Sequence, residues 1–124
     1  MKLSPNFSLS EFASKDGATT PAAAIKNLKE ICANLEVLRQ ELGGKSITIN
    51  SGYRSKEHNK SVGGKSSSQH LSGKAADIVV SGVTPKVVAD TIEKLMTQGK
   101  MKQGGIGRYS GFVHVDVRGT KARW

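Results

Sequence analysis

An apolar pattern between residues 25 and 42 constrains the fold more than any other feature of the sequence. Apolar residues recur there at three- and four-residue intervals, at Ile25, Leu28, Ile31, Cys32, Leu35, Leu38 and Leu42. Thr20 and Pro21 precede the segment as a cap and a first-turn proline, and Gly43–Gly44 ends it. We predict one long helix whose apolar stripe forms the main wall of the core.

Two shorter apolar segments predict strands, and a cap signal predicts a second helix. Residues 47–49 alternate between apolar and polar side chains, which is the pattern of a strand with one buried face. Residues 75–80 are apolar and rich in β-branched side chains except for Asp77, which predicts a buried strand containing one carboxylate. Thr84–Pro85 then repeats the cap-and-proline signal before a helix that ends near Gly99.

A hairpin is predicted near the C-terminus. Residues 105–109 and 112–117 have the composition of two strands joined by a tight turn at Ser110–Gly111. Because side chains alternate between the two faces of a strand, the three valines at alternate positions of the second strand would face the core. His114 and Asp116 would then point together from the opposite face.

These elements predict a small α+β fold that forms one domain over residues 1–124, with an antiparallel sheet flanked by helices. With 36% hydrophobic residues, a chain of 124 residues can bury a modest core. Cys32 is the only cysteine, which excludes an intrachain disulfide and a zinc site built from thiolates. No apolar segment has the length of a membrane span, and residues 1–7 lack the apolar region of a secretory signal.

The charge of the chain favours a polyanionic partner. Nineteen Lys and Arg against ten Asp and Glu leave a formal net charge of +9, which attracts polyanions over long distances. Nucleic acid and an anionic bacterial cell wall are both candidates. The basic residues are scattered and no platform of aromatic side chains accompanies them, so charge alone does not choose between the two.

The segment from Ser68 to Asp77 carries candidate metal ligands. His70 and Asp77 lie seven positions apart across a glycine-bearing turn, and His114 could supply a third ligand. Two imidazoles and one carboxylate suit zinc with an open coordination position, and a metal would compensate the buried carboxylate. The same spacing is compatible with a solvated loop histidine at His70 and with a core histidine bonded to backbone at His114.

Two further residues could take part in chemistry at such a site. Asp116 could accept a proton from a reacting water. Arg54, on the turn after the strand at 47–49, could bind a substrate carboxylate or stabilise a developing oxyanion. The simpler alternatives are an ion pair of Asp116 with Arg118 or Arg108, and a surface position for Arg54.

The segment from Ser68 to Asp77 also contains a recognisable signature. Its pattern is Ser-x-His-x-x-Gly-x-Ala-x-Asp, filled by Ser68, His70, Gly73, Ala75 and Asp77. This pattern resembles that of the zinc D-Ala-D-Ala carboxypeptidase family, the DD- and LD-peptidases of bacterial peptidoglycan, whose fold is shared with the Hedgehog signalling domain. The similarity continues into residues 51–64 and 111–124, so it covers about residues 46–124.

The resemblance implies roles for individual residues. His70, Asp77 and His114 would be the zinc ligands, and Arg54 would be the arginine that polarises the substrate. Further residues from the matched segments are expected to contact the substrate, and they are Ser68, Gln69 and Tyr53.

The general base is where this chain departs from the family pattern. Relatives carry an acidic residue three positions before the last ligand, or a histidine two positions before it. These positions here are Gly111 and Phe112. We therefore expect Asp116 to act as the base, with two alternatives left open: a carboxylate that orients a ligand, or a direct zinc ligand.

The function implied by the resemblance is zinc-dependent hydrolysis of peptidoglycan. The bonds cut would involve D-amino acids in stem or cross-link peptides, with the protein acting as a carboxypeptidase or an endopeptidase on the anionic wall, in the periplasm or outside the cell. The N-terminus would suit a phage endolysin or a mature form. No nucleic-acid partner is expected. A non-catalytic zinc-containing wall-binding module and a basic nucleic-acid-binding protein remain the alternatives.

Overall fold

The computed structural model describes all of residues 1–124 and contains α-helices, short 3-10 helices and strands. The helices are α1 (Ala22–Glu41), α2 (Lys56–Ser61), α3 (Pro85–Thr97), η1 (Leu9–Glu11) and η2 (Gln69–Ser72). The strands are β1 (Lys2–Ser4), β2 (Phe7–Ser8), β3 (Ile47–Ser51), β4 (Ala75–Val80), β5 (Gly105–Arg108), β6 (Val113–Asp116) and β7 (Ala122–Arg123).

Five strands form one sheet in the order β3-β4-β6-β5-β7, and β1 and β2 form a separate hairpin. All neighbours in the large sheet are antiparallel except β5 and β7, which are parallel. The α+β class is confirmed, but the sheet is mixed and not wholly antiparallel as predicted. The chain reverses direction after β6, so β7 runs the same way as β5 when it pairs with that strand.

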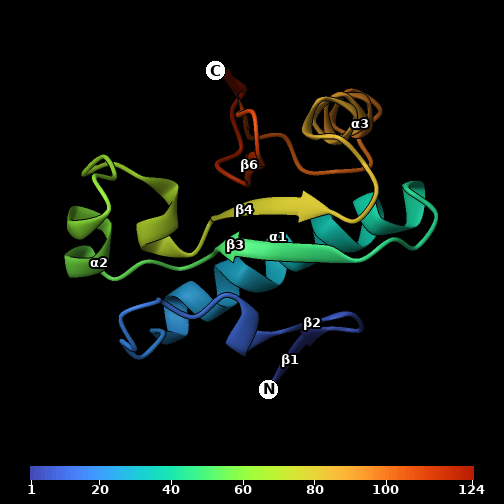
Figure 1. The fold of residues 1–124 in the computed structure, drawn as a ribbon. Coiled ribbons are helices and arrows are strands. Elements are labelled where there is room, and N and C mark those ends of the chain that lie inside the picture. The colour runs from blue at the N-terminus through green and yellow to red at the C-terminus, as the bar shows by residue number, and fades with distance from the viewer.

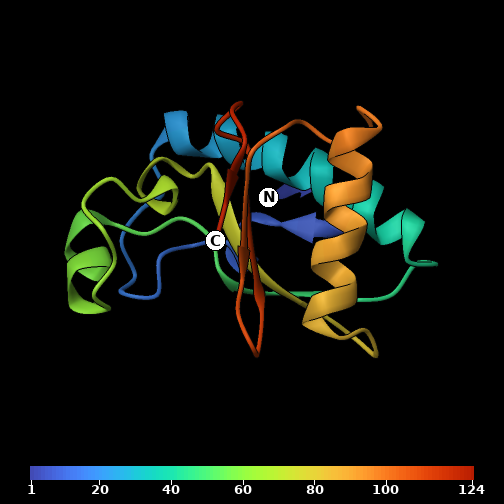
Figure 2. The same cartoon turned by 90° about the horizontal axis from the view of Figure 1, so that it is seen from above.

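The helices are unequally distributed around the sheet. α1 and α3 contact each other and both contact β4, so they cover the same face. Figures 1 and 2 show α2 at the opposite end of the molecule from α3, next to the end of β3. The long segment between β3 and β4, which carries α2 and η2, therefore lies at one end of the sheet and leaves the sheet face opposite α1 available for a site.

The predicted long helix is confirmed as α1, with one difference at its start. Leu28, Ile31, Leu35 and Leu38 are completely buried in the main core. The N-cap is Pro21 and not Thr20, and it carries no side-chain cap. At α3 the same signal works as predicted, because the hydroxyl of Thr84 accepts a hydrogen bond from the backbone N–H of Val87 at 3.3 Å.

β4 and β6 contribute apolar side chains to the core and polar side chains to the candidate site. The predicted valines of the last strand segment are buried in the core cluster, and Asp77, His114 and Asp116 are buried polar residues. The alternation expected for β6 is therefore confirmed. None of the helices combines the length and the apolar character needed to cross a membrane.

Candidate metal centre

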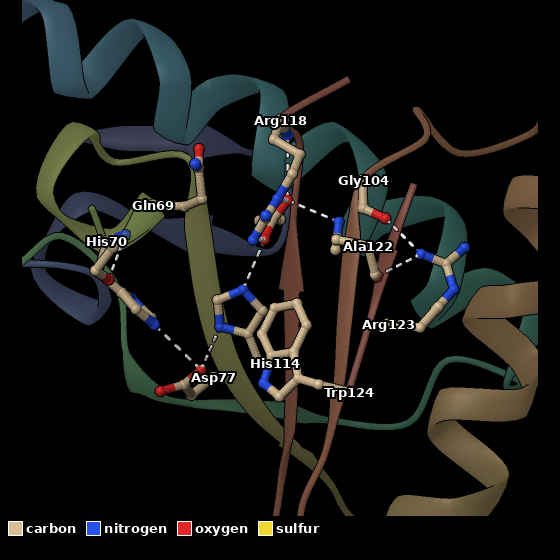
Figure 3. Close-up of polar contacts among 12 residues, drawn as sticks. Gln69, His70, Asp77, Gly104, His114, Arg118, Ala122, Arg123 and Trp124 are labelled. Carbon is tan, nitrogen blue, oxygen red and sulfur yellow. Dashed lines mark hydrogen bonds and ion pairs between the residues drawn. The ribbon is translucent and has the colours of Figure 1, made fainter. Parts of the chain in front are cut away.

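Three side chains from three different elements converge on one point. His70 comes from η2, Asp77 from β4 and His114 from β6, and one potential ligand atom from each lies within 4.8 Å of the other two. The Oδ1 atom of Asp77 is 3.2 Å from His70 Nε2 and 3.2 Å from His114 Nδ1. Figure 3 shows both imidazoles directed at this carboxylate.

Strand pairing brings two of these residues together. Asp77 and His114 are direct partners in the antiparallel register of β4 and β6, and opposite side chains of such a pair lie on the same face of the sheet. The carboxylate within the apolar segment and the histidine near the C-terminus therefore become neighbours through pairing alone.

His70 reaches the site because η2 is held at both ends. The hydroxyl of Ser68 accepts a hydrogen bond from the backbone N–H of His70 at 3.2 Å, and Gly73 ends the turn with a φ of +74°. His70 Nδ1 lies 2.7 Å from the carbonyl oxygen of Gly52. A carbonyl only accepts, so Nδ1 carries the proton and Nε2 is left to face Asp77.

His114 is oriented by a carboxylate on its other side. Its Nε2 lies 2.8 Å from Oδ2 of Asp116, a residue with no exposed surface. Asp116 also accepts hydrogen bonds from the backbone N–H of Gly105 at 2.7 Å and from the guanidinium of Arg118 at 3.0 and 2.8 Å. The outer nitrogen of His114 is thus occupied, and its Nδ1 faces Asp77.

Arg54 lies at the edge of the three-residue cluster. Its Nη2 is 3.3 Å from Oδ2 of Asp77, and its other two nitrogens donate to Ser51 and Asn59 at 3.0 and 3.2 Å. The backbone N–H of Arg54 donates to the carbonyl of His70 at 3.0 Å. The turn after β3 and the turn of η2 therefore position each other.

The electrostatics of the cluster keep both carboxylates ionised. Burial alone raises the pKa of Asp77, but the close contacts with His114 and His70 outweigh it and leave the pKa below its usual range. The same balance lowers the pKa of Asp116 through His114 and Arg118. Burial lowers the pKa of His114, but its bonds to Asp116 and Asp77 raise it overall. The cluster therefore favours a positive charge between its side chains.

The donor set fits zinc. The Nε2 atom of His70 and the Nδ1 atom of His114 both face a carboxylate oxygen, while the other nitrogen of each ring already has a hydrogen-bond acceptor. In a neutral ring each of these two nitrogens carries a lone pair that is directed at the Asp77 carboxylate. Lone pairs and an anion repel each other, so a cation between them makes the arrangement favourable. Two imidazole nitrogens and one carboxylate are a ligand set of catalytic zinc sites, in which a further position stays open.

The cluster forms part of the wall of a pocket of about 610 Å³. Ser68 and Gln69, for which the resemblance implies a substrate contact, line this pocket, and so does Arg54. Tyr53 does not: it is 9% exposed and belongs to the hydrophobic core, so its expected substrate contact is not supported by its position. The reason is that Tyr53 and Arg54 are consecutive, and only the arginine is directed to the pocket.

Sequence reasoning missed the aromatic and basic part of the pocket. Its lining includes Lys65, Tyr109, Phe112, Arg118 and Trp124, none of which was assigned to the site. Alternation along β6 was an available signal for Arg118, because it lies two residues after Asp116. Trp124 lies in the segment 111–124 that resembles the family, but no spacing in the sequence indicated its contacts, which depend on the parallel pairing of β7 with β5.

Comparison with known proteins agrees with the signature around His70. The family model described as peptidase M15 matches residues 5–116. Over 62 residues the chain is 40% identical to the zinc D-Ala-D-Ala carboxypeptidase of Streptomyces albus G, a stretch that makes up 50% of this chain and 24% of that relative. The similarity thus spans about a quarter of the length of this curated relative. Because the family match covers most of the chain and includes all three residues of the cluster, the chain belongs to the peptidase M15 family.

Proposed function

We propose that this protein is a zinc metallopeptidase that hydrolyses peptide bonds involving D-amino acids in peptidoglycan. The observation that carries the proposal is the convergence of His70, Asp77 and His114 on one point beside an open pocket, in a chain of the peptidase M15 family. The name of the Streptomyces relative supports the substrate class.

In this proposal the three clustered residues hold zinc. His70 and His114 each present one nitrogen, because the other nitrogen is bonded to Gly52 or Asp116. Zinc, when bound, supplies Lewis acidity at a position that water and substrate can reach from the pocket. The carboxylate of Asp77 completes the ligand set and holds the two imidazoles in register.

Arg54 is proposed to bind the substrate. A guanidinium has five N–H donors, and three of those of Arg54 are used on Ser51, Asn59 and Asp77. The remaining two can bind a peptide carboxylate or the oxygen that gains charge during hydrolysis. The fixed contacts prepare the guanidinium before substrate arrives, which lowers the cost of ordering it.

For Asp116 the geometry favours the orienting role over that of general base. A base must reach the reacting water within hydrogen-bonding distance, but Asp116 has no exposed surface and is bonded to His114, Arg118 and Gly105. We therefore propose that Asp116 fixes the tautomer and the rotation of His114, as carboxylates behind metal-bound histidines do. Asp77 carries the only side-chain carboxylate that lines the pocket.

The proposed partner is the anionic cell wall, in the periplasm or outside the cell. Four cationic side chains line the pocket, those of Arg54, Lys65, Arg118 and Arg123, against the single side-chain carboxylate of Asp77. The net charge of +9 extends this preference to the whole molecule. Both carboxypeptidase and endopeptidase action are compatible with the proposal, and the released fragments distinguish them.

The test is digestion of purified peptidoglycan, with the products identified by mass. We expect fragments that differ by hydrolysis of one bond next to a D-amino acid, loss of activity with a chelator, and recovery with Zn²⁺. His70→Ala should be inactive.

The matched control is His58→Ala, because His58 lies on α2 and does not line the pocket. It should digest the wall like the wild type. Activity that survives the chelator, or a His70→Ala protein as active as the control, would contradict the proposal.

A further inference from the structure

The indole of Trp124, the only tryptophan in the chain, lies against the candidate ligand His114. The two ring centroids are 4.8 Å apart with an angle of 50° between the planes. Figure 3 shows the indole beside the imidazole, on the side away from His70. Trp124 is nevertheless 47% exposed and lines the pocket, so it contacts the ligand and the pocket at once.

A glycine provides the place where this indole lies. Gly107 is the direct partner of His114 in the register of β5 and β6. A Cβ atom at Gly107 would come within 2.6 Å of Trp124 Nε1 and 2.7 Å of Cε2, closer than nonbonded atoms approach. The indole therefore lies across β5 at the one position of that strand pair that leaves room beside His114.

Two further side chains contact the indole. Its Nε1–H donates to the hydroxyl of Tyr109 at 2.9 Å, and the guanidinium of Arg118 lies 5.4 Å from the ring centroid. The backbone of Trp124 pairs with that of Ile106 and Arg108 at 3.1 and 2.8 Å. A side chain at the end of the chain is thus fixed by one backbone pairing and two side-chain contacts.

Arg123, the last residue of β7 and the residue before Trp124, anchors this end of the chain. Arg123 donates to Glu93 of α3 at 2.7 Å, to the carbonyl of Gly104 at 2.6 Å and to Gln103 at 2.9 Å. These bonds tie β7 to α3 and to the segment before β5. The position of the indole is therefore determined by the body of the fold and not by a free C-terminal tail.

We propose that Trp124 is a positioning residue of the metal centre and the apolar wall of its substrate pocket. Its indole restrains the imidazole of His114 on one side, while Asp116 holds the outer nitrogen on the other. Its exposed face, continued by the stacked rings of Tyr109 and Phe112 at 4.4 Å, packs against the aliphatic part of the peptide. The second half of this proposal rests on the proposed function.

The proposal divides the pocket into an aromatic side and a polar side. The aromatic wall comes from residues directly next to the ends of β5, β6 and β7, whereas the opposite lining comes from residues 63–69, which include Lys65, Ser67 and Ser68 but no aromatic side chain. An aliphatic side chain of the substrate is therefore directed to Trp124. A carboxylate of the same peptide is directed to Lys65 and Arg54, because the two arginines on the aromatic side, Arg118 and Arg123, are already paired with Asp116 and Glu93.

The metal arm of the test uses Co²⁺ with the full-length protein and needs no catalysis. Co²⁺ quenches nearby indoles, so its binding should quench the fluorescence of Trp124. Affinity is measured by competition with a chromophoric chelator. Trp124→Ala should weaken Co²⁺ binding about tenfold, the lower end of the effect of residues that orient metal ligands. Trp124→Phe keeps a ring and should bind Co²⁺ nearly as the wild type does.

A matched pair of glycine variants tests whether the space at Gly107 positions the indole of Trp124. Gly107→Ala removes no side chain of the site but displaces the indole, so it should weaken Co²⁺ binding and reduce the quenching. Gly111→Ala is the control on the same hairpin, because a Cβ there meets no atom within 4 Å. It should behave as the wild type, and thermal denaturation establishes that both variants are folded.

The substrate arm compares kinetic constants on a wall peptide. Trp124→Ala should raise KM more than it lowers kcat at saturating Zn²⁺, and Trp124→Phe should restore most of the loss. Equal Co²⁺ affinity in the wild type and Trp124→Ala, or identical behaviour of Gly107→Ala and Gly111→Ala, overturns the positioning role. An unchanged KM in Trp124→Ala contradicts the proposed contact between Trp124 and the aliphatic part of the peptide.

The two proposals fail in different ways. If Co²⁺ quenches Trp124 and the variants weaken its binding while no wall peptide is cleaved, the positioning role stands and the proposed function is lost. If wall peptides are cleaved but neither metal affinity nor KM responds to Trp124, the proposed function stands and this inference is overturned.

Discussion

At the scale of single residues, Asp116 illustrates how burial and charge combine in this protein. It has no exposed surface, and burying a carboxylate is costly unless hydrogen bonds and a counter-charge compensate. Arg118 supplies two hydrogen bonds and a positive charge, and Gly105 and His114 supply further contacts. The result is an ionised group that cannot reach the pocket but holds the ring that does.

We predict that Asp116→Asn weakens zinc binding while preserving the fold. The amide keeps the size of the side chain but loses the charge, so Arg118 loses its ionic partner and the Nε2–H of His114 loses a charged acceptor. Zinc affinity should fall about 10- to 100-fold. The free energy of unfolding should fall by on the order of 2–3 kcal/mol. Chelator competition and urea denaturation measure the two effects.

Asp90→Asn is the control for that variant. Asp90 also pairs with two cations, Lys86 and Arg108, but all of these side chains are largely exposed. Exposed ion pairs contribute little to stability, so this variant should bind zinc and unfold as the wild type does. If the two variants weaken zinc binding equally, the orienting role of Asp116 is wrong.

At the scale of elements, the short helix α2 supports Arg54 from outside the sheet. Asn59 of α2 accepts a hydrogen bond from Arg54 at 3.2 Å and donates one to the carbonyl of Lys65 at 2.9 Å. It thereby links the turn after β3 to the polar wall of the pocket. A Cβ atom at Gly64 would collide with the Asn59 amide, so the glycine leaves the room that this link requires.

We predict that Gly64→Ala lowers kcat/KM without removing zinc. The added methyl group displaces Asn59, and Arg54 loses one of its three fixed contacts. Misplacing a substrate-binding group by about 1 Å can cost up to about 100-fold in rate, so we expect a loss of about 10- to 100-fold. Zinc affinity should be unchanged, because the three ligands do not contact Asn59.

Steady-state kinetics and chelator competition on the same preparations check this prediction. Gly111→Ala again serves as the control, since its methyl group meets open space. Loss of zinc in Gly64→Ala together with loss of activity would show that the effect lies in the metal site and not in Arg54.

At the scale of the whole molecule, the cluster joins parts of the chain that are far apart in sequence. His70, Asp77 and His114 come from η2, β4 and β6, and β4 is the second strand of the sheet order while β6 is the third. A metal ion can bind all three residues only when the chain is folded. Metal binding and global stability are therefore coupled.

We predict that Zn²⁺ raises the melting temperature of the metal-free protein. At a free concentration 100 times Kd, a ligand that binds only the folded state adds about 2.7 kcal/mol to the free energy of unfolding. A chain of 124 residues should then melt several degrees higher. Calorimetry with and without Zn²⁺ measures the shift.

His114→Ala and His58→Ala distinguish specific binding from nonspecific binding. The first variant removes a ligand and should lose the shift, whereas the second removes a histidine that does not line the pocket and should keep it. An equal shift in both variants would contradict a zinc site at the cluster.

The sequence by itself determined the local elements and the identity of the clustered residues. The spacing in α1, the Thr84–Pro85 cap and the alternation in β6 all depend on interactions within a few residues, which local patterns record. The signature between Ser68 and Asp77 likewise named two residues of the cluster that the structure brings together.

The tertiary structure alone decided how the site is completed. The parallel pairing of β5 with β7, the burial of Tyr53 and the complete burial of Asp116 arise from contacts between segments that are distant in sequence. The same holds for Trp124, whose indole reaches His114 because β7 returns along β5 and Gly107 leaves room there. Such contacts are set by how strands pair and pack, and no pattern within a short window of sequence records them.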